Sequence, residues 1–157
     1  MRMNRLSLAA IALIASLGPW APIHAQDMLP APDPAIAGMT PDELVATREA
    51  KMRENGGILR SAAGLTGAAA EEAAGRVLQN FVDFVPLFDQ RSQSALNNST
   101  LPLAWEDWAG FVAIFEASQQ AALKMKTAAA AGDQAGYSEA VQTIGGHCGQ
   151  CHGKYRL

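Results

Sequence analysis

The 157-residue chain is poor in cysteine and in aromatic residues, and its acidic residues outnumber its basic ones. Two cysteines are too few for a scaffold held by disulfides. Aromatic residues make up only 6% of the chain, and its alanine-rich stretches favour helices over strands. A formal net charge of -3 gives no reason to expect a nucleic acid as partner. The 49% of hydrophobic residues, at a length typical of one domain, are sufficient for a real core.

Long apolar runs are also scarce. Only residues 6–17 (LSLAAIALIASL) approach a membrane span, and they fall short of the roughly 20 residues that spanning requires. Arg2 and Arg5 precede this run, and residues 23–25 (IHA) resemble a cleavage site. We therefore predict a signal peptide at 1–25 that is removed on export to the periplasm and leaves no membrane anchor. An uncleaved anchor is the alternative.

The rest of the chain predicts an all-α, antiparallel four-helix bundle. Residues 26–39 hold three prolines and suggest an extended tail, which leaves 40–157 as the folded domain. Thr40, Pro41 and Glu43 form a strong helix start with a capping box. The predicted helices run from 40 to about 64, from about 68 to 85 before Pro86, from about 102 to 131, and from 133 to about 156, with a polar loop at 90–100.

The motif that carries chemistry is Cys148-Gly-Gln-Cys151-His152, the C-x-x-C-H sequence that attaches c-type haem. Residues i and i+3 share one face of a helix, so both thiols reach the two vinyl groups of one porphyrin, with the histidine under the iron. A thioredoxin-like site would need a βαβ pattern, a zinc site would need four ligands, and a disulfide here would be strained. We predict one covalent haem c on Cys148 and Cys151 with His152 as axial ligand. His147 is expected on the surface.

A second axial ligand is available from a thioether. Met52 lies in the middle of the first predicted helix, and Arg48 lies one turn earlier on the same face. A guanidinium for a haem propionate and a thioether for the iron suit one site. Gly56 continues this face and would let a flat macrocycle approach the backbone. The alternatives are that Met52 fills the core and that Arg48 is solvated on the surface.

These residues resemble the class II c-type cytochromes, four-helix bundles with haem near the C-terminus that include the cytochromes c′ and the cytochromes c-556. The similarity spans nearly the whole chain after residue 25, and the C-terminal segment is its most specific part. The matching parts are residues 48–52 (REAKM), Trp105 with Phe111, residues 131–133 (AGD) and residues 144–156 (IGGHCGQCHGKYR).

The resemblance implies the same haem attachment, a propionate contact from Arg48 and a position near the haem for Arg156. In cytochromes c-556 a methionine at the position of Met52 binds the iron. Cytochromes c′ usually leave the iron five-coordinate, high-spin and open to NO or CO. We predict a one-electron carrier with His152 and Met52 as ligands, and keep the open, gas-binding site as the alternative.

The sequence shows no recognisable set of residues for acid–base or nucleophilic catalysis, so an enzyme is not predicted. Redox partner proteins are expected, and a homodimer follows by analogy, because relatives are often dimers through their first two helices. A third alternative is a helical bundle with a vestigial haem motif. It would fold without haem, although apolar faces built around the motif would then enclose a void.

Overall fold

The computed structural model describes residues 28–157, and the predicted signal peptide at 1–25 lies outside the described residues. The elements are η2 (Pro34–Gly38), α1 (Pro41–Ala62), α2 (Gly67–Leu87), η3 (Gln90–Ser94), α3 (Leu103–Glu106), α4 (Trp108–Ala131) and α5 (Gln134–Tyr155). An isolated antiparallel bridge joins Thr100 to Arg156. Over residues 28–157, no helix combines the length and the apolar character that crossing a membrane would require.

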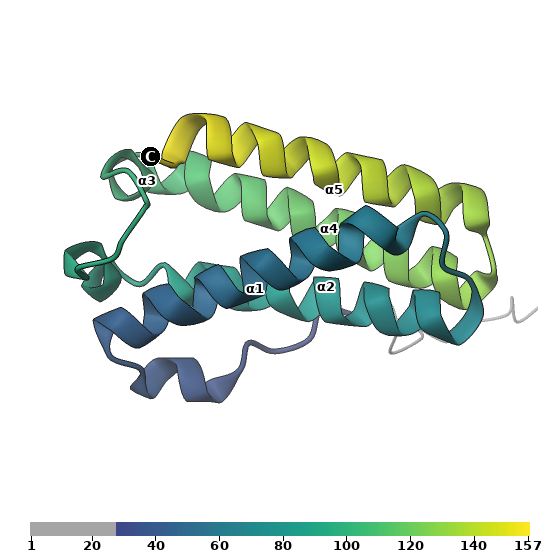
Figure 1. The fold of residues 1–157 in the computed structure, drawn as a ribbon, viewed down its shortest axis with the longest axis horizontal. Coiled ribbons are helices and arrows are strands. Elements are labelled where there is room, and N and C mark those ends of the chain that lie inside the picture. Colours follow the sequence, from purple (N-terminus) through teal and green to yellow (C-terminus); the bar gives the residue numbers. More distant parts are fainter. Residues whose placement is uncertain (1–27) are drawn as a thin grey trace, which may run out of the picture.

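The four long helices α1, α2, α4 and α5 form the predicted antiparallel bundle (Figure 1). Helix α4 packs against both α2 and α5, and α1 packs mainly on α2. Contact between α1 and α5 is sparse by comparison. Large side chains from all four helices are fully buried between them, among them Leu44, Phe84, Phe111 and Ile144. The weak α1–α5 contact leaves the space in which the candidate site lies.

Helix α1 begins where its capping residues predict. The Thr40 hydroxyl accepts the Glu43 N–H at 3.4 Å, and the Glu43 carboxylate accepts the Thr40 N–H at 2.7 Å. This reciprocal pair satisfies two of the amides that a helix start leaves without partners. Gly56 and Gly57 do not interrupt the helix, which continues to Ala62. Packing against α2 therefore outweighs their low helix propensity.

Two predicted boundaries differ from the structure. Helix α2 passes Pro86 and ends at Leu87, because a proline in the last turn removes a single hydrogen bond and the Phe88 N–H still closes the helix. The predicted helix over 102–131 is two helices, since Asp107 leaves the helical conformation at φ -107° and ψ 51°. Its carboxylate then accepts the Gly110 N–H at 3.3 Å and caps α4.

Over residues 28–39, the N-terminal segment contains a turn of 3-10 helix, whereas an extended tail was predicted for 26–39. Asp33 caps a turn of 3-10 helix, η2, and its side chain accepts the Ala35 N–H at 2.9 Å. Ile36 in this turn is buried in the core. The Asp33 N–H also donates to the Asp83 carboxylate on α2 at 2.8 Å. One apolar side chain and one buried acceptor thus hold the segment against the bundle.

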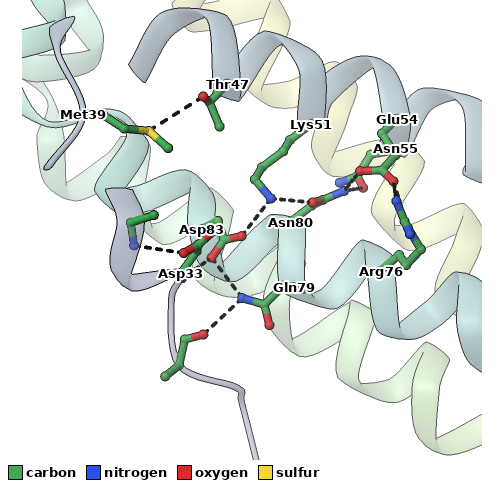
Figure 2. A network of polar contacts seen from close by, with 12 residues as sticks. Asp33, Met39, Thr47, Lys51, Glu54, Asn55, Arg76, Gln79, Asn80 and Asp83 are labelled. Atoms are coloured by element: carbon green, nitrogen blue, oxygen red, sulfur yellow. Dashed lines mark hydrogen bonds and ion pairs between the residues drawn. The ribbon is translucent and has the colours of Figure 1, made fainter. Parts of the chain in front are cut away.

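A polar network fixes α1 on α2 (Figure 2). Lys51 forms an ion pair with the buried carboxylate of Asp83 at 2.9 Å and donates to Asn80 at 3.1 Å. Asn80 in turn donates to Asn55 at 2.8 Å and to Glu54 at 2.9 Å. Directional bonds of this kind set the rotation of α1 about its axis. Another face of α1 is thereby turned toward α5.

Candidate functional site

A cavity of about 640 Å³ lies between α1 and α5, near the end of the bundle where α5 finishes. This size suits a small ligand or a cofactor, which typically occupies roughly 300–1,000 Å³. Phe88, from the end of α2, and Phe111, from α4, form apolar wall, and Ser99 and Thr100 close one side. The cavity is thus lined by α1, α4 and α5 and by the residue that caps the end of α2.

The α1 wall carries the predicted axial ligand. Met52 is half-buried, packs against the core and lines the cavity. Gly56, one turn later, also lines it, and a Cβ built there would come within 4 Å only of the Arg60 guanidinium, at 3.5 Å. Glu49, Arg53, Gly56 and Arg60 recur at spacings of four, three and four, so one face of α1 supplies the wall.

The α5 wall carries the C-x-x-C-H motif. Cys151 is buried and lines the cavity together with the exposed His152 and the buried Tyr155. Cys148 is half-buried against the core, one turn earlier, and is not among the side chains that line the cavity. The structure therefore brings Met52, Cys151 and His152 to one cavity. The other motif cysteine, Cys148, lies three residues before Cys151 on α5.

Burial sets the protonation of these groups. It raises the pKa of both thiols, that of Cys151 to about 11, with a smaller contribution from the neighbouring Cys148. Both thiols are therefore neutral at pH 7. Burial, followed by the nearby charge of Arg156, lowers the pKa of His152. Its imidazole is therefore neutral at pH 7, which is the form that binds a metal.

Arg48 is buried and donates several hydrogen bonds, and is not a solvated surface side chain. It is 3% exposed, and its guanidinium lies over the Phe88 ring at 4.4 Å from the centroid. Burial lowers its pKa to about 10, so it stays charged at pH 7. Its two terminal nitrogens donate to the Leu87 carbonyl at 3.3 Å, Ser92 Oγ at 2.8 Å, Thr100 Oγ1 at 3.3 Å and Asn98 Oδ1. Sequence reasoning missed this role.

The connection after η3 joins the two walls. Its Asn98 and Thr100 accept from Arg48 on α1, as described above. On the other side the Leu101 N–H donates to the Tyr155 carbonyl at 2.8 Å, and the Leu157 N–H donates to the Ser99 carbonyl at 2.9 Å. Residues 98–101 thus tie the α1 wall to the C-terminal end of the α5 wall.

Asp107 fixes the last turn of α5. Its carboxylate accepts from Lys154 Nζ at 2.7 Å and from the Tyr155 hydroxyl at 2.6 Å. These hydrogen bonds lower the pKa of Asp107, which is therefore ionised at neutral pH. The Tyr155 ring packs edge-on against Phe111, with centroids 5.0 Å apart. The turn that carries His152 is therefore anchored to α4.

The second histidine of this region has a packing role. His147 was expected on the surface, but it is half-buried, and its Nδ1 lies 3.3 Å from Ser118 Oγ on α4. The Ser118 hydroxyl donates its hydrogen to the Ile114 carbonyl at 2.7 Å. His147 does not line the cavity. It therefore contributes to α4–α5 packing.

We predict that Arg48→Met destabilises the haem-containing protein by about 3 kcal/mol, because four acceptors around the guanidinium lose a charged donor. Urea unfolding measures this difference. Arg53→Met, an exposed arginine on the same helix, is the matched control and should stay within about 0.5 kcal/mol of wild type. Equal unfolding free energies for the two variants would mean that these hydrogen bonds add nothing.

Comparison with protein-family models gives a match to the family described as Cytochrome C' over residues 43–156. This range begins in the first turn of α1 and ends one residue after α5. The chain belongs to the cytochrome c′ family. Comparison with curated protein sequences gives no match.

Solved structures of cytochromes c′ share the fold. That from Rubrivivax gelatinosus has a TM-score of 0.69 and 22% identity, and the similarity covers 76% of this chain and 98% of that one. For the protein from Thermochromatium tepidum the TM-score is 0.67 and the identity 20%, over the same shares of the two chains. A nitric oxide complex of a mutant cytochrome c prime from Alcaligenes xylosoxidans has a TM-score of 0.61 and 22% identity. The similarity covers 74% of this chain and 96% of that one.

As a member of the cytochrome c′ family, the chain is a c-type cytochrome with one covalently attached haem. The cavity fits that group. Its apolar wall of Phe88, Phe111 and Tyr155 suits a macrocycle, and one motif thiol and the motif histidine face it. Arginines around it suit the two carboxylates that a haem carries.

Proposed function

We propose that this protein is an exported one-electron carrier whose haem iron is bound by His152 and Met52. The supporting observation is that these two side chains line one cavity from two different helices, α5 and α1. Imidazole and thioether together are the ligand pair of many electron-transfer haems. The bound haem supplies a one-electron couple at its iron. Met52 as ligand raises the reduction potential relative to two histidines.

Cys148 and Cys151 are proposed to form the two thioether bonds. Their spacing of three residues on α5 directs both toward one face of the helix, with His152 adjacent. Anchoring of the following turn by Asp107 keeps the imidazole in place. A ligand held this rigidly changes little between two oxidation states, which favours rapid electron exchange.

The propionates are proposed to lie among the arginines of the cavity. Four of the five guanidinium N–H bonds of Arg48 go to protein acceptors, which leaves its Nε–H for a carboxylate. Arg156 is exposed at the cavity edge and can supply a second contact. The propionate contact predicted for Arg48 is thus limited to one donor unless its side chain rearranges.

The second candidate is an open, five-coordinate iron that binds NO or CO, with Met52 as a wall of the pocket. The observation in its favour is that one solved family member is described as a nitric oxide complex. Met52 is only half-buried, which is compatible with a wall position as well. Both candidates use the same attachment by Cys148, Cys151 and His152.

We further propose residues 1–25 as a removed signal peptide, 26–39 as an N-terminal extension and 40–157 as the cytochrome domain. Such a signal would send the chain to the periplasm, where its partners would be redox proteins. A homodimer is proposed on family analogy alone. No enzymatic activity is proposed.

Absorption spectra of the purified holoprotein test the ligation. We expect a low-spin spectrum, a sharp α-band after dithionite reduction, and no change when CO is added. A broad high-spin spectrum that shifts with CO would instead establish an open iron. Gas binding would then replace electron transfer as the better account.

A further inference from the structure

Positive charge is concentrated at the cavity of this acidic protein. Of the basic residues within 28–157, four of 10 line it, against one of 14 acidic residues in the same range. All four are arginines, and the acidic residue is Glu49. The chain as a whole carries a formal charge of -3. The cavity is therefore a positive region on a negative molecule.

Haem binding does not account for all of this charge. Two propionates neutralise at most two arginines, and Glu49 offsets a third, with its carboxylate 3.7 Å from Arg53. One positive charge remains in excess. Arg48 is enclosed among protein acceptors, whereas Arg53, Arg60 and Arg156 are exposed. These three residues, here called the arginine rim, face the solvent at the edge of the cavity.

We propose that the arginine rim is the docking surface for a redox partner protein that presents an acidic patch around its own redox centre. The proposal rests on the proposed function, because it assumes that electrons enter or leave through this opening. The proposal is based on charge complementarity, because an acidic partner is attracted to this opening and repelled by the rest of the surface. Low-dielectric walls around such an opening focus the field and speed encounter.

Apolar surface lies next to the rim. Leu157 follows Arg156 directly, is 80% exposed, and is held at the cavity wall by its hydrogen bond to Ser99. Protein interfaces combine apolar with polar surface, and Leu157 adds apolar surface directly beside Arg156.

The test measures one-electron oxidation of the reduced holoprotein by stopped flow with two small probes. Hexacyanoferrate(III) is an anion, tris(phenanthroline)cobalt(III) is a cation, and each takes one electron from the ferrous protein. In Arg53→Glu/Arg60→Glu at low salt, the rate constant with the anion should fall about tenfold, and that with the cation should rise. Both differences should collapse in roughly 0.5 M salt, where charges are screened.

Lys124→Glu/Lys126→Glu is the matched control, because it changes the net charge equally at two residues of α4 that do not line the cavity. Its rate constants should change less than twofold. Equal effects of the two pairs would overturn the proposal, since only overall charge would then matter. If the reversed pair does not fold, Arg53→Gln/Arg60→Gln should show the same directions with smaller changes.

An acidic polypeptide tests docking itself. Poly-L-glutamate should slow oxidation of the wild type by hexacyanoferrate(III) at low salt and have no effect on the Arg53→Glu/Arg60→Glu variant, while poly-L-lysine should not slow the wild type. Equal slowing of both proteins by poly-L-glutamate would contradict the assignment of the rim. A wild type that exchanges electrons with neither small probe would refute the proposed function and, with it, this inference.

Discussion

Replacement of both Cys148 and Cys151 by alanine is expected to give a protein with no covalent haem. These are the only two cysteines of the chain, so no other thiol can form a thioether bond. Haem staining after denaturing electrophoresis, together with the mass of the intact chain, measures the loss. Wild type should retain one haem per chain under the same conditions.

The single variants refine this result. Cys151 lines the cavity and Cys148 does not, so Cys151→Ala should remove more haem than Cys148→Ala. Gln150→Ala lies in the same turn and keeps both thiols, so it should keep the full amount of haem. Haem that survives denaturation in the double variant would disprove attachment through this motif.

Loss of the haem should also reduce stability. Without it, the cavity lined by Phe88, Phe111 and Tyr155 loses the apolar macrocycle that would fill it. Any group that binds only the folded state stabilises it, and a covalent haem does so permanently. The double variant should therefore unfold at a lower urea concentration than Gln150→Ala.

Features that depend on neighbouring residues could be predicted from the sequence. The start of α1 rests on a contact between Thr40 and Glu43, three residues apart. The motif of Cys148, Cys151 and His152 lies within one turn of α5. Local spacing was sufficient for the helix start and for the one covalent haem that the family carries, while the role of each motif residue stays a prediction.

Features that depend on residues far apart in the chain could not be predicted from the sequence. The acceptors around Arg48 come from positions 39 to 52 residues further along the chain, so no local pattern marks this arginine as buried. The break at Asp107 was missed for a related reason. Its carboxylate caps α4 and also binds Lys154 and Tyr155, 47 and 48 residues away. The cap is local, but the contacts that hold it are not.

The face of α1 that lines the cavity could be predicted in part. Arg53, Gly56 and Arg60 share a face by their spacing, and that spacing is visible in the sequence. What the sequence does not reveal is that this face meets α5 across a cavity rather than bulk solvent. The orientation follows from the Lys51–Asp83 contact, which fixes the other side of the helix on α2.

Met52→Ala is expected to convert a low-spin haem to a high-spin, five-coordinate one that binds CO. In the proposed ligation, removing the thioether would leave His152 as the only axial ligand. The smaller side chain also opens the α1 wall. The reduction potential should fall, because a thioether stabilises the reduced iron. Absorption spectra with and without CO, and a redox titration, measure the three changes.

Met52→Leu separates ligation from the loss of volume. Leucine fills a similar space but cannot bind the iron, so this variant should also be high-spin, with slower CO binding than Met52→Ala because the wall is retained. Met125→Leu, a substitution at a buried methionine of α4 outside the cavity, should keep the wild-type spectrum. If Met52 is only a wall, the wild type is already high-spin and Met52→Leu leaves it so. Only Met52→Ala would then alter CO binding, and the iron would have to be regarded as an open site.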